Sequence, residues 1–368
     1  MSVPADLRER ARRLVSLAPG RVDHIPALRI AAGLAVPLAI LLATDRVEWS
    51  MYASFGAFTG IYSRYEPTAQ RFRRQSFIGL LLTACVGIGA VLASLGTPGG
   101  ILGAGADAPA AVLAPGTLPW ITMIVGALVA AFSAMEIARR GIRPGGALFP
   151  LFAVAAVASA PAAAPVQLAV LIAAGSAAWC VLLGLLGHYL GERHPGAGVA
   201  PPRERFAPGR LMRLGAGYFA AAVVAGAIGI LSGLPFPYWA QIAAIVPLSA
   251  AGHGAQVERG VHRLIGTVLG IGVTAFLLSF PAQAWQLAVW VVLLQFLAEL
   301  YVLRNYALAL CFVTPLALLM VQMAHPQEAG PMLQARLGET AIGVGIGIVV
   351  VVIIAVAGRS AHRIRSTG

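Results

Sequence analysis

The chain has 368 residues, of which 59% are hydrophobic and 11% are charged, and its formal net charge is +12. A soluble domain usually carries about 25% charged residues, so this composition excludes a soluble protein. It predicts an all-α, polytopic helical membrane protein.

Apolar runs of membrane-spanning length recur from one end of the chain to the other. A helix needs about 20 mostly apolar residues to cross the hydrocarbon core, which is roughly 30 Å thick. We therefore predict about twelve transmembrane helices, at 27–44, 49–62, 76–95, 118–138, 146–160, 166–190, 211–231, 238–251, 264–280, 284–302, 306–323 and 339–357. The segments 49–62, 146–160 and 238–251 are short, which is typical of tilted helices or of broken helices that line a cavity.

The remaining segments predict the domain organisation. Residues 1–26 are predicted to form an amphipathic cytoplasmic segment, because apolar residues share one helical face and arginines surround it; the alternative is a frayed charged tail. No cleavable signal peptide is predicted. Two six-helix membrane units follow at 27–190 and 211–357, and a linker at 191–210, rich in Pro, Gly and Arg, joins them. Residues 358–368 form a basic cytoplasmic tail.

The basic charge follows the predicted topology. All 26 basic residues are arginines, and with a cytoplasmic N-terminus 24 of them fall on the cytoplasmic side; only Arg46 and Arg336 fall outside. Positive charge concentrates on the cytoplasmic side of membrane proteins, so both chain ends are predicted to be cytoplasmic. The charge is therefore topological and does not indicate binding to nucleic acid.

The two membrane units resemble each other in sequence. A shift of 190 positions (239 − 49 and 263 − 73) aligns Trp49 with Trp239 and Arg73 with Arg263. The long outer loop at 96–119 of the first unit corresponds to the brief 280–284 of the second. Because six helices per unit is an even number, the units are predicted to be parallel repeats with a pathway between them. The alternative is that shared helix-packing constraints make two apolar segments align.

The stretch QVERGVHRLIGTVLG at 256–270 places charge directly before a glycine-spaced helix. Gly266 and Gly270 are four residues apart, a spacing that lets a neighbouring helix approach closely, and Thr267 lies on the same stripe. Arg263 presents a guanidinium at the cytoplasmic mouth of this helix, and guanidiniums match carboxylates bidentately. The alternative is that Arg263 is an ordinary cytoplasmic anchor.

The pattern PYWAQIAAIVP followed by RGVHRLIGTVLG resembles the membrane domain of the FUSC family, the fusaric-acid-resistance-like proteins. The features carrying the resemblance are the aromatic pair Tyr238 and Trp239 that opens a short helix, then Arg263, Gly266, Thr267 and Gly270. In the first unit only Trp49 and Arg73 match. The resemblance implies export of aromatic carboxylic acids. It also implies that substrate binds at Arg73, Arg263, Thr267, Trp49, Tyr238 and Trp239.

Two carboxylates lie at corresponding places, near the ends of the fourth helix of each unit. Glu136 and Glu299 are candidates for proton coupling, with interfacial ion pairs to nearby arginines as the alternative. Arg336 and Glu339 open the last helix and fit either an outer gate or an interfacial anchor. The three cysteines lie in apolar spans without paired spacing, so neither a disulfide nor a metal site is predicted.

The topology and the repeat predict an inner-membrane transporter in a bacterial plasma membrane, and the resemblance implies that it exports small organic anions with the proton gradient as driving force. A passive anion channel and a non-transporting scaffold for an envelope-assembly partner are the alternatives. The sequence carries no nucleotide-binding loop and no nucleophile constellation, so we predict neither an enzyme nor a cofactor. The predicted partners are the organic anion, the lipid bilayer, and either a second copy of the chain or an envelope protein.

Overall fold

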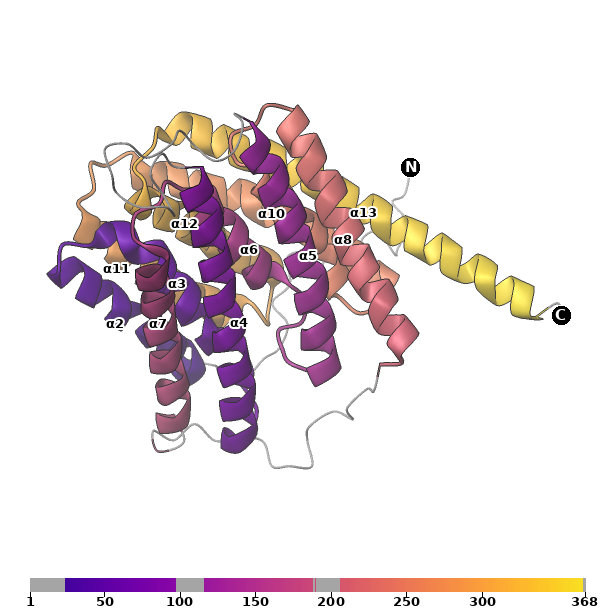
Figure 1. Cartoon of the computed structure of the whole chain (residues 1–368), viewed down its shortest axis with the longest axis horizontal. Helices are drawn as coiled ribbons and strands as arrows, with labels where there is room; N and C mark the ends of the chain where they lie inside the picture. The colour runs from indigo at the N-terminus through magenta and orange to yellow at the C-terminus, as the bar shows by residue number, and fades with distance from the viewer. Residues whose placement is uncertain (1–23, 97–115, 188, 190–205, 367–368) are drawn as a thin grey trace, which may run out of the picture.

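The structure, a computed structural model, describes residues 24–96, 116–187, 189 and 206–366, with side chains up to residue 356. Every regular element in these ranges is helical, as predicted. The predicted N-terminal segment, the long outer loop and the linker lie wholly or largely outside them, and so do the side chains of the basic tail. The α-helices (Figure 1) are α2 (His24–Ala43), α3 (Ser50–Ala57), α4 (Thr68–Leu95), α5 (Thr117–Arg140), α6 (Leu148–Ala158), α7 (Val166–Leu186), α8 (Pro208–Leu231), α9 (Tyr238–Ile245), α10 (His253–Leu278), α11 (Ala284–Tyr301), α12 (Tyr306–Ala324) and α13 (Ala329–Ser366).

Nine of the described helices are long and apolar enough to cross a membrane. The other three, α3, α6 and α9, contain 8, 11 and 8 residues. At 1.5 Å per residue they extend about 12 to 17 Å, well short of the hydrocarbon core. The predicted number of helices therefore agrees with the structure, but three of the twelve predicted spans are too short to cross as single helices.

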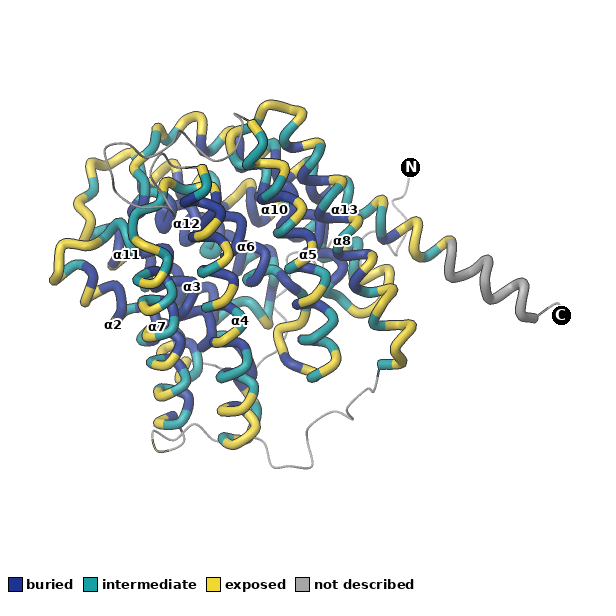
Figure 2. The backbone as a smooth tube through the Cα atoms, in the orientation of Figure 1, coloured by how far each residue is buried: buried dark blue, intermediate teal, exposed yellow. Residues whose placement is uncertain are grey.

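The short helices lie inside the protein (Figure 2). Every residue of α3 and of α9 is buried, and so are nine of the eleven residues of α6. A buried position suits them, because backbone groups at a helix end inside a membrane need protein or water as hydrogen-bond partners. α9 ends at Ile245, and Pro247 begins a short 3-10 turn, so the helix is broken where the proline removes a backbone donor.

The helices of residues 24–186, here called the first half, pack in a defined set of pairs. α3 contacts α2 and α7, α4 contacts α6 and α7, α5 contacts α6, and α2 contacts α7. Residues 208–356, the second half, show the same order of pairs. There α9 contacts α8 and α13, α10 contacts α12 and α13, α11 contacts α12, and α8 contacts α13.

The two halves meet through reciprocal contacts. The fourth helix of the first half, α5, packs against the first helix of the second half, α8, and α11 packs against α2 in the same way. Between these contacts, α6 touches α9 and α3 touches α12. The short buried helices therefore meet at the centre of the junction.

The glycines of the 256–270 stretch allow close packing of α10 on α12. A β-carbon at Gly266 would lie 2.5 Å from the carbonyl oxygen of Ala307 and from Cβ of Leu310. A β-carbon at Gly270 would lie 2.6 Å from Cβ of Thr314. Because these neighbours are backbone or rigid side-chain atoms, the two helices can approach this closely only with glycine at both positions.

Gly266→Ala is expected to destabilise the protein, because the added methyl group forces α10 away from α12. Overpacking of this kind costs about 1–3 kcal/mol. The measurement is the thermal unfolding midpoint of the purified protein in detergent. Gly272→Ala on the same helix is the matched control, since a β-carbon there meets nothing within 4 Å. Equal midpoints for the two variants would contradict the close approach.

Candidate anion-binding site

A small cavity of about 50 Å³ lies where the two halves meet. Helices from both halves line it, and the first half supplies only apolar side chains, namely Phe58, Ile61, Leu148, Phe149 and Phe152. The second half supplies the polar groups together with further apolar ones, namely Trp239, Ile242, Arg263, Gln295, Ala298, Glu299, Val313, Leu316, Ala317 and Arg336.

Aromatic rings form one wall of the cavity. The ring centroid of Phe152 lies 4.7 Å from that of Trp239 and 4.9 Å from that of Phe55. Phe58 and Phe149 make a second pair at 4.9 Å. Rings packed in this way are rigid and offer their faces and edges to a further aromatic group.

Two buried arginines line the same cavity. The exposed fractions of Arg263 and Arg336 are 2% and 1%, and within the described part of the chain neither makes a hydrogen bond or an ion pair. The guanidinium carbon of Arg336 lies 3.6 Å from the ring centroid of Trp239, a cation–π contact. Burying an unpaired charge costs several kcal/mol, and the two positive charges also repel each other. The arrangement therefore favours binding of an anion.

A buried ion pair joins the halves at the edge of the cavity. Arg64, which follows α3 in the first half, forms an ion pair with the carboxylate of Glu299 on α11 and donates to its backbone oxygen at 3.0 Å. Gln295 donates to the same carboxylate at 2.9 Å. Both charged side chains are more than 90% buried. Glu299 is thus neutralised by its own partner and does not offset the charge of Arg263 or Arg336.

A second buried carboxylate lies one helical turn after Arg336. Glu339 on α13 is fully buried, and its Oε1 accepts a hydrogen bond from the backbone N–H of Phe236 at 2.8 Å. Its Oε2 has no hydrogen-bond partner within the described residues. Glu339 is the acidic residue nearest to Arg336 in the sequence, and no ion pair among the described residues neutralises its charge.

The structure brings only some of the predicted substrate-binding residues together. Trp239 and Arg263 line the cavity, and Tyr238 packs beside Trp239 with ring centroids 4.9 Å apart. Thr267 is fully buried one turn after Arg263. Trp49 lies outside the cavity, where its indole N–H donates to the carbonyl of Ala163 at 3.1 Å.

Arg73 is not brought to Arg263. It is exposed on α4, whereas the buried arginine of that turn is Arg71, which donates to the carbonyl oxygen of Gly184. Residues two apart on a helix point to nearly opposite sides, so Arg71 faces the interior and Arg73 faces out.

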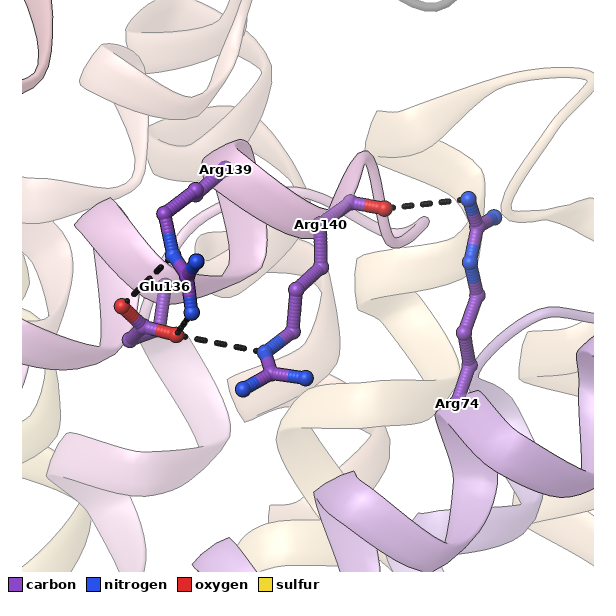
Figure 3. Close-up of polar contacts among 4 residues, drawn as sticks. All are labelled: Arg74, Glu136, Arg139 and Arg140. Carbon is purple, nitrogen blue, oxygen red and sulfur yellow. Dashed lines mark hydrogen bonds and ion pairs between the residues drawn. The ribbon is translucent and has the colours of Figure 1, made fainter.

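The predicted proton carrier Glu136 lies at the end of α5, among arginines (Figure 3). Its carboxylate accepts hydrogen bonds from Arg139 at 2.7 and 2.9 Å and from Arg140 at 3.2 Å. Arg74 of α4 donates to the backbone oxygen of Arg140 at 3.0 Å. Glu136 therefore belongs to an ion-pair cluster at the end of α5 and is not among the residues that line the cavity.

Comparison with known proteins gives one family. Residues 210–350 match the fusaric acid resistance protein-like family. This range contains the motif residues from Tyr238 to Gly270 and all of the polar side chains that line the cavity, so the predicted resemblance is confirmed for the second half. A relative is the "uncharacterized membrane protein YvaC" of Bacillus subtilis (strain 168), which is 31% identical over 135 residues. The aligned region covers 36% of this chain and about a fifth (21%) of the relative. No solved structure matches the chain.

The sequence contains a pattern that predicts the buried position of Arg336 and Glu339 on α13, although the substrate site was not predicted from it. Within the segment that matches the family model, Glu339, Gly343 and Gly347 follow one another at intervals of four residues. A β-carbon at Gly343 or Gly347 would lie 2.2 or 2.5 Å, respectively, from a backbone carbonyl oxygen of α9. A glycine stripe of this kind predicts a buried helix face, which Arg336 shares at one turn's distance. Arg64 carries no comparable signal, because it lies between helices.

Proposed function

We propose that the protein transports small organic anions, such as aromatic carboxylates, across the bacterial inner membrane in the export direction that the family resemblance implies. The observation that carries the proposal is the pair of buried, unpaired guanidiniums of Arg263 and Arg336 beside an aromatic wall. Their planar forks suit the two oxygens of a carboxylate, and the rings of Trp239 and Phe152 suit an attached aromatic group. The match of residues 210–350 to the fusaric acid resistance protein-like family supports a role in transport.

The cavity has to widen for such a substrate. Ligand pockets usually measure about 300 to 1,000 Å³, and the present cavity is several times smaller than this range. Two halves that meet through reciprocal helix pairs can open by moving against each other. We infer that this structure represents a closed state and that the Arg64–Glu299 ion pair is one of the contacts that break on opening.

We further propose that the chain consists of two parallel six-helix repeats. The two halves show the same order of helix pairs, which supports this proposal. At the junction, the fourth helix of each half packs against the first helix of the other half, which supports it as well. The arginine distribution supports cytoplasmic chain ends, with the three short helices and their flanking residues completing three of the twelve crossings, and the parallel repeats support a cavity on the axis between them.

The driving force has two candidates. An inside-negative membrane potential favours outward movement of an anion by about 2.3 kcal/mol per 100 mV for each charge. The second candidate is the proton gradient, the driving force predicted from the sequence, with Glu136 or Glu299 as the proton carrier. Each of these carboxylates has an arginine partner, which favours the ionised form and makes it a poor proton acceptor.

The test is efflux of radiolabelled benzoate from liposomes that contain the purified protein. Efflux is followed with the external medium more acidic than, equal to, or more alkaline than the interior, and with an imposed potential. Protein-dependent, saturable efflux supports the transporter. Unsaturable, voltage-dependent current without pH dependence would replace it with a channel, and no flux for benzoate or for a panel of aliphatic carboxylates would favour the scaffold.

A further inference from the structure

We infer that Glu339 is the proton-binding residue of the anion site, and that a proton on Glu339 and an organic anion at Arg263 and Arg336 stabilise each other. This inference rests on the proposed function, because it names the group that links that function to pH. The carboxylates predicted for this role from the sequence were Glu136 and Glu299.

The surroundings of Glu339 differ from those of the other carboxylates. Within the described residues only Glu299 and Glu339 are buried carboxylates, and Glu299 has Arg64 as its ion-pair partner. Among the described residues no ion pair within 4 Å involves Glu339, and its fixed hydrogen-bond partner is the single backbone N–H of Phe236. A buried carboxylate without a paired cation can be stabilised by taking up a proton.

The groups that face Glu339 come from its own helix and from α9. Arg336 lies one turn earlier on α13, and Tyr238 is the titratable group that α9 contributes. Arg263 of α10 and Tyr306 of α12 interact electrostatically with Arg336. The other elements packed against α13 are α8 and the 3-10 turn after α9, and neither contributes a charged group to Glu339 within the described part of the chain.

The charges in the site determine the sign of the coupling. Arg263 and Arg336 contribute two positive charges, and an ionised Glu339 offsets one of them. An incoming carboxylate then meets a like charge at Glu339, and a proton on that residue removes this repulsion. By thermodynamic linkage, a bound anion must favour protonation of Glu339 to the same extent. An acidic compartment thus favours loading of the site and an alkaline compartment favours release.

This sign separates two mechanisms of transport. If the proton stays with the anion, the membrane potential no longer drives the movement, and efflux from liposomes is faster into an alkaline medium than into an acidic one. Proton-driven export by exchange would show the opposite dependence. If proton and anion move together, the cell's inward proton gradient opposes export; in exchange the same gradient drives export, so the sign of the pH effect distinguishes the two mechanisms.

The experiment measures equilibrium binding of radiolabelled benzoate to the purified full-length chain from about pH 6 to about pH 9, where a free carboxylic acid with a pKa of about 4 is fully ionised. The wild type is expected to bind benzoate about 5- to 150-fold more tightly at the acidic end, the usual range for coupled sites. Glu339→Gln is expected to bind tightly at every pH. Glu258→Gln, which changes an exposed carboxylate on α10, is the matched control and should retain the pH dependence.

A second measurement does not depend on the ligand. Infrared difference spectra across the same pH range should show the band of a buried protonated carboxylic acid in the wild type, and Glu339→Gln should lack it. A pH-dependent affinity that persists in Glu339→Gln, or the absence of this band from the wild type, would overturn the inference. Failure of the wild type to bind benzoate at any pH, with the band present, would instead contradict the proposed function.

Discussion

Arg336→Ala is expected to abolish saturable benzoate transport and to weaken benzoate binding by about 30-fold to several thousand-fold. The range corresponds to the roughly 2–5 kcal/mol lost when one partner of a buried, hydrogen-bonded charge pair is truncated. Arg263→Ala should produce a loss of similar size, because both guanidiniums line the same cavity. Equilibrium binding and liposome efflux measure the two effects.

The controls for this prediction are arginines outside the cavity. Arg213→Ala, at an exposed position on α8, should leave binding unchanged. Arg73→Ala distinguishes the pair predicted from the repeat, Arg73 with Arg263, from the pair found in the structure. Loss of binding in Arg73→Ala together with normal binding in Arg336→Ala would contradict the assignment. Arg263→Ala should also be at least as resistant to heat as the wild type without ligand, since it removes one of two buried positive charges that repel each other.

The second large effect is expected at the ion pair between the halves. Arg64→Ala leaves the buried carboxylate of Glu299 without its cation, and changes of this kind cost about 3–5 kcal/mol. The measurement is the free energy of unfolding, or the thermal midpoint under fixed detergent conditions. Gln295 still donates to Glu299 in this variant, but one neutral donor does not replace a guanidinium.

A double-mutant cycle isolates this interaction. Combining Arg64→Ala with Glu299→Gln removes both charges, so the double variant should be more stable than Arg64→Ala alone. It should also open more readily, which predicts faster uptake of benzoate into the cavity than in the wild type. Strictly additive losses of stability would show that the two charges do not interact across the junction.

The positions of the helices could be predicted from the sequence because apolar length and turn residues report them directly. The short helices show where this signal fails. The segment 238–251 is mostly apolar, but α9 ends at Ile245 because Pro247 interrupts it, and residues 246–248 are apolar and buried without continuing the α-helix. At α10 the observed helix is longer than the predicted span 264–280. It begins at His253 and includes the charged turns before the apolar run.

The site could be predicted only in part, for reasons of register and of sequence distance. Arg263 and Trp239 lie in one continuous motif, so their proximity is visible in the sequence. Arg73 aligned with Arg263, yet a difference of two residues in register turns Arg71 inward instead. Arg336 comes from a helix whose glycine stripe predicts a buried face, but the stripe does not specify that α9, and with it Trp239, is the partner of that face.

The most direct test of the central claim is a structure of the protein with 4-iodobenzoate, in which anomalous scattering locates the iodine. The account predicts the carboxylate between the guanidiniums of Arg263 and Arg336, with the iodinated ring against Trp239 and Phe152 in a widened cavity. Iodine bound only at the membrane surface, beside exposed arginines such as Arg139, would contradict it. So would a widened cavity that stays empty at saturating ligand.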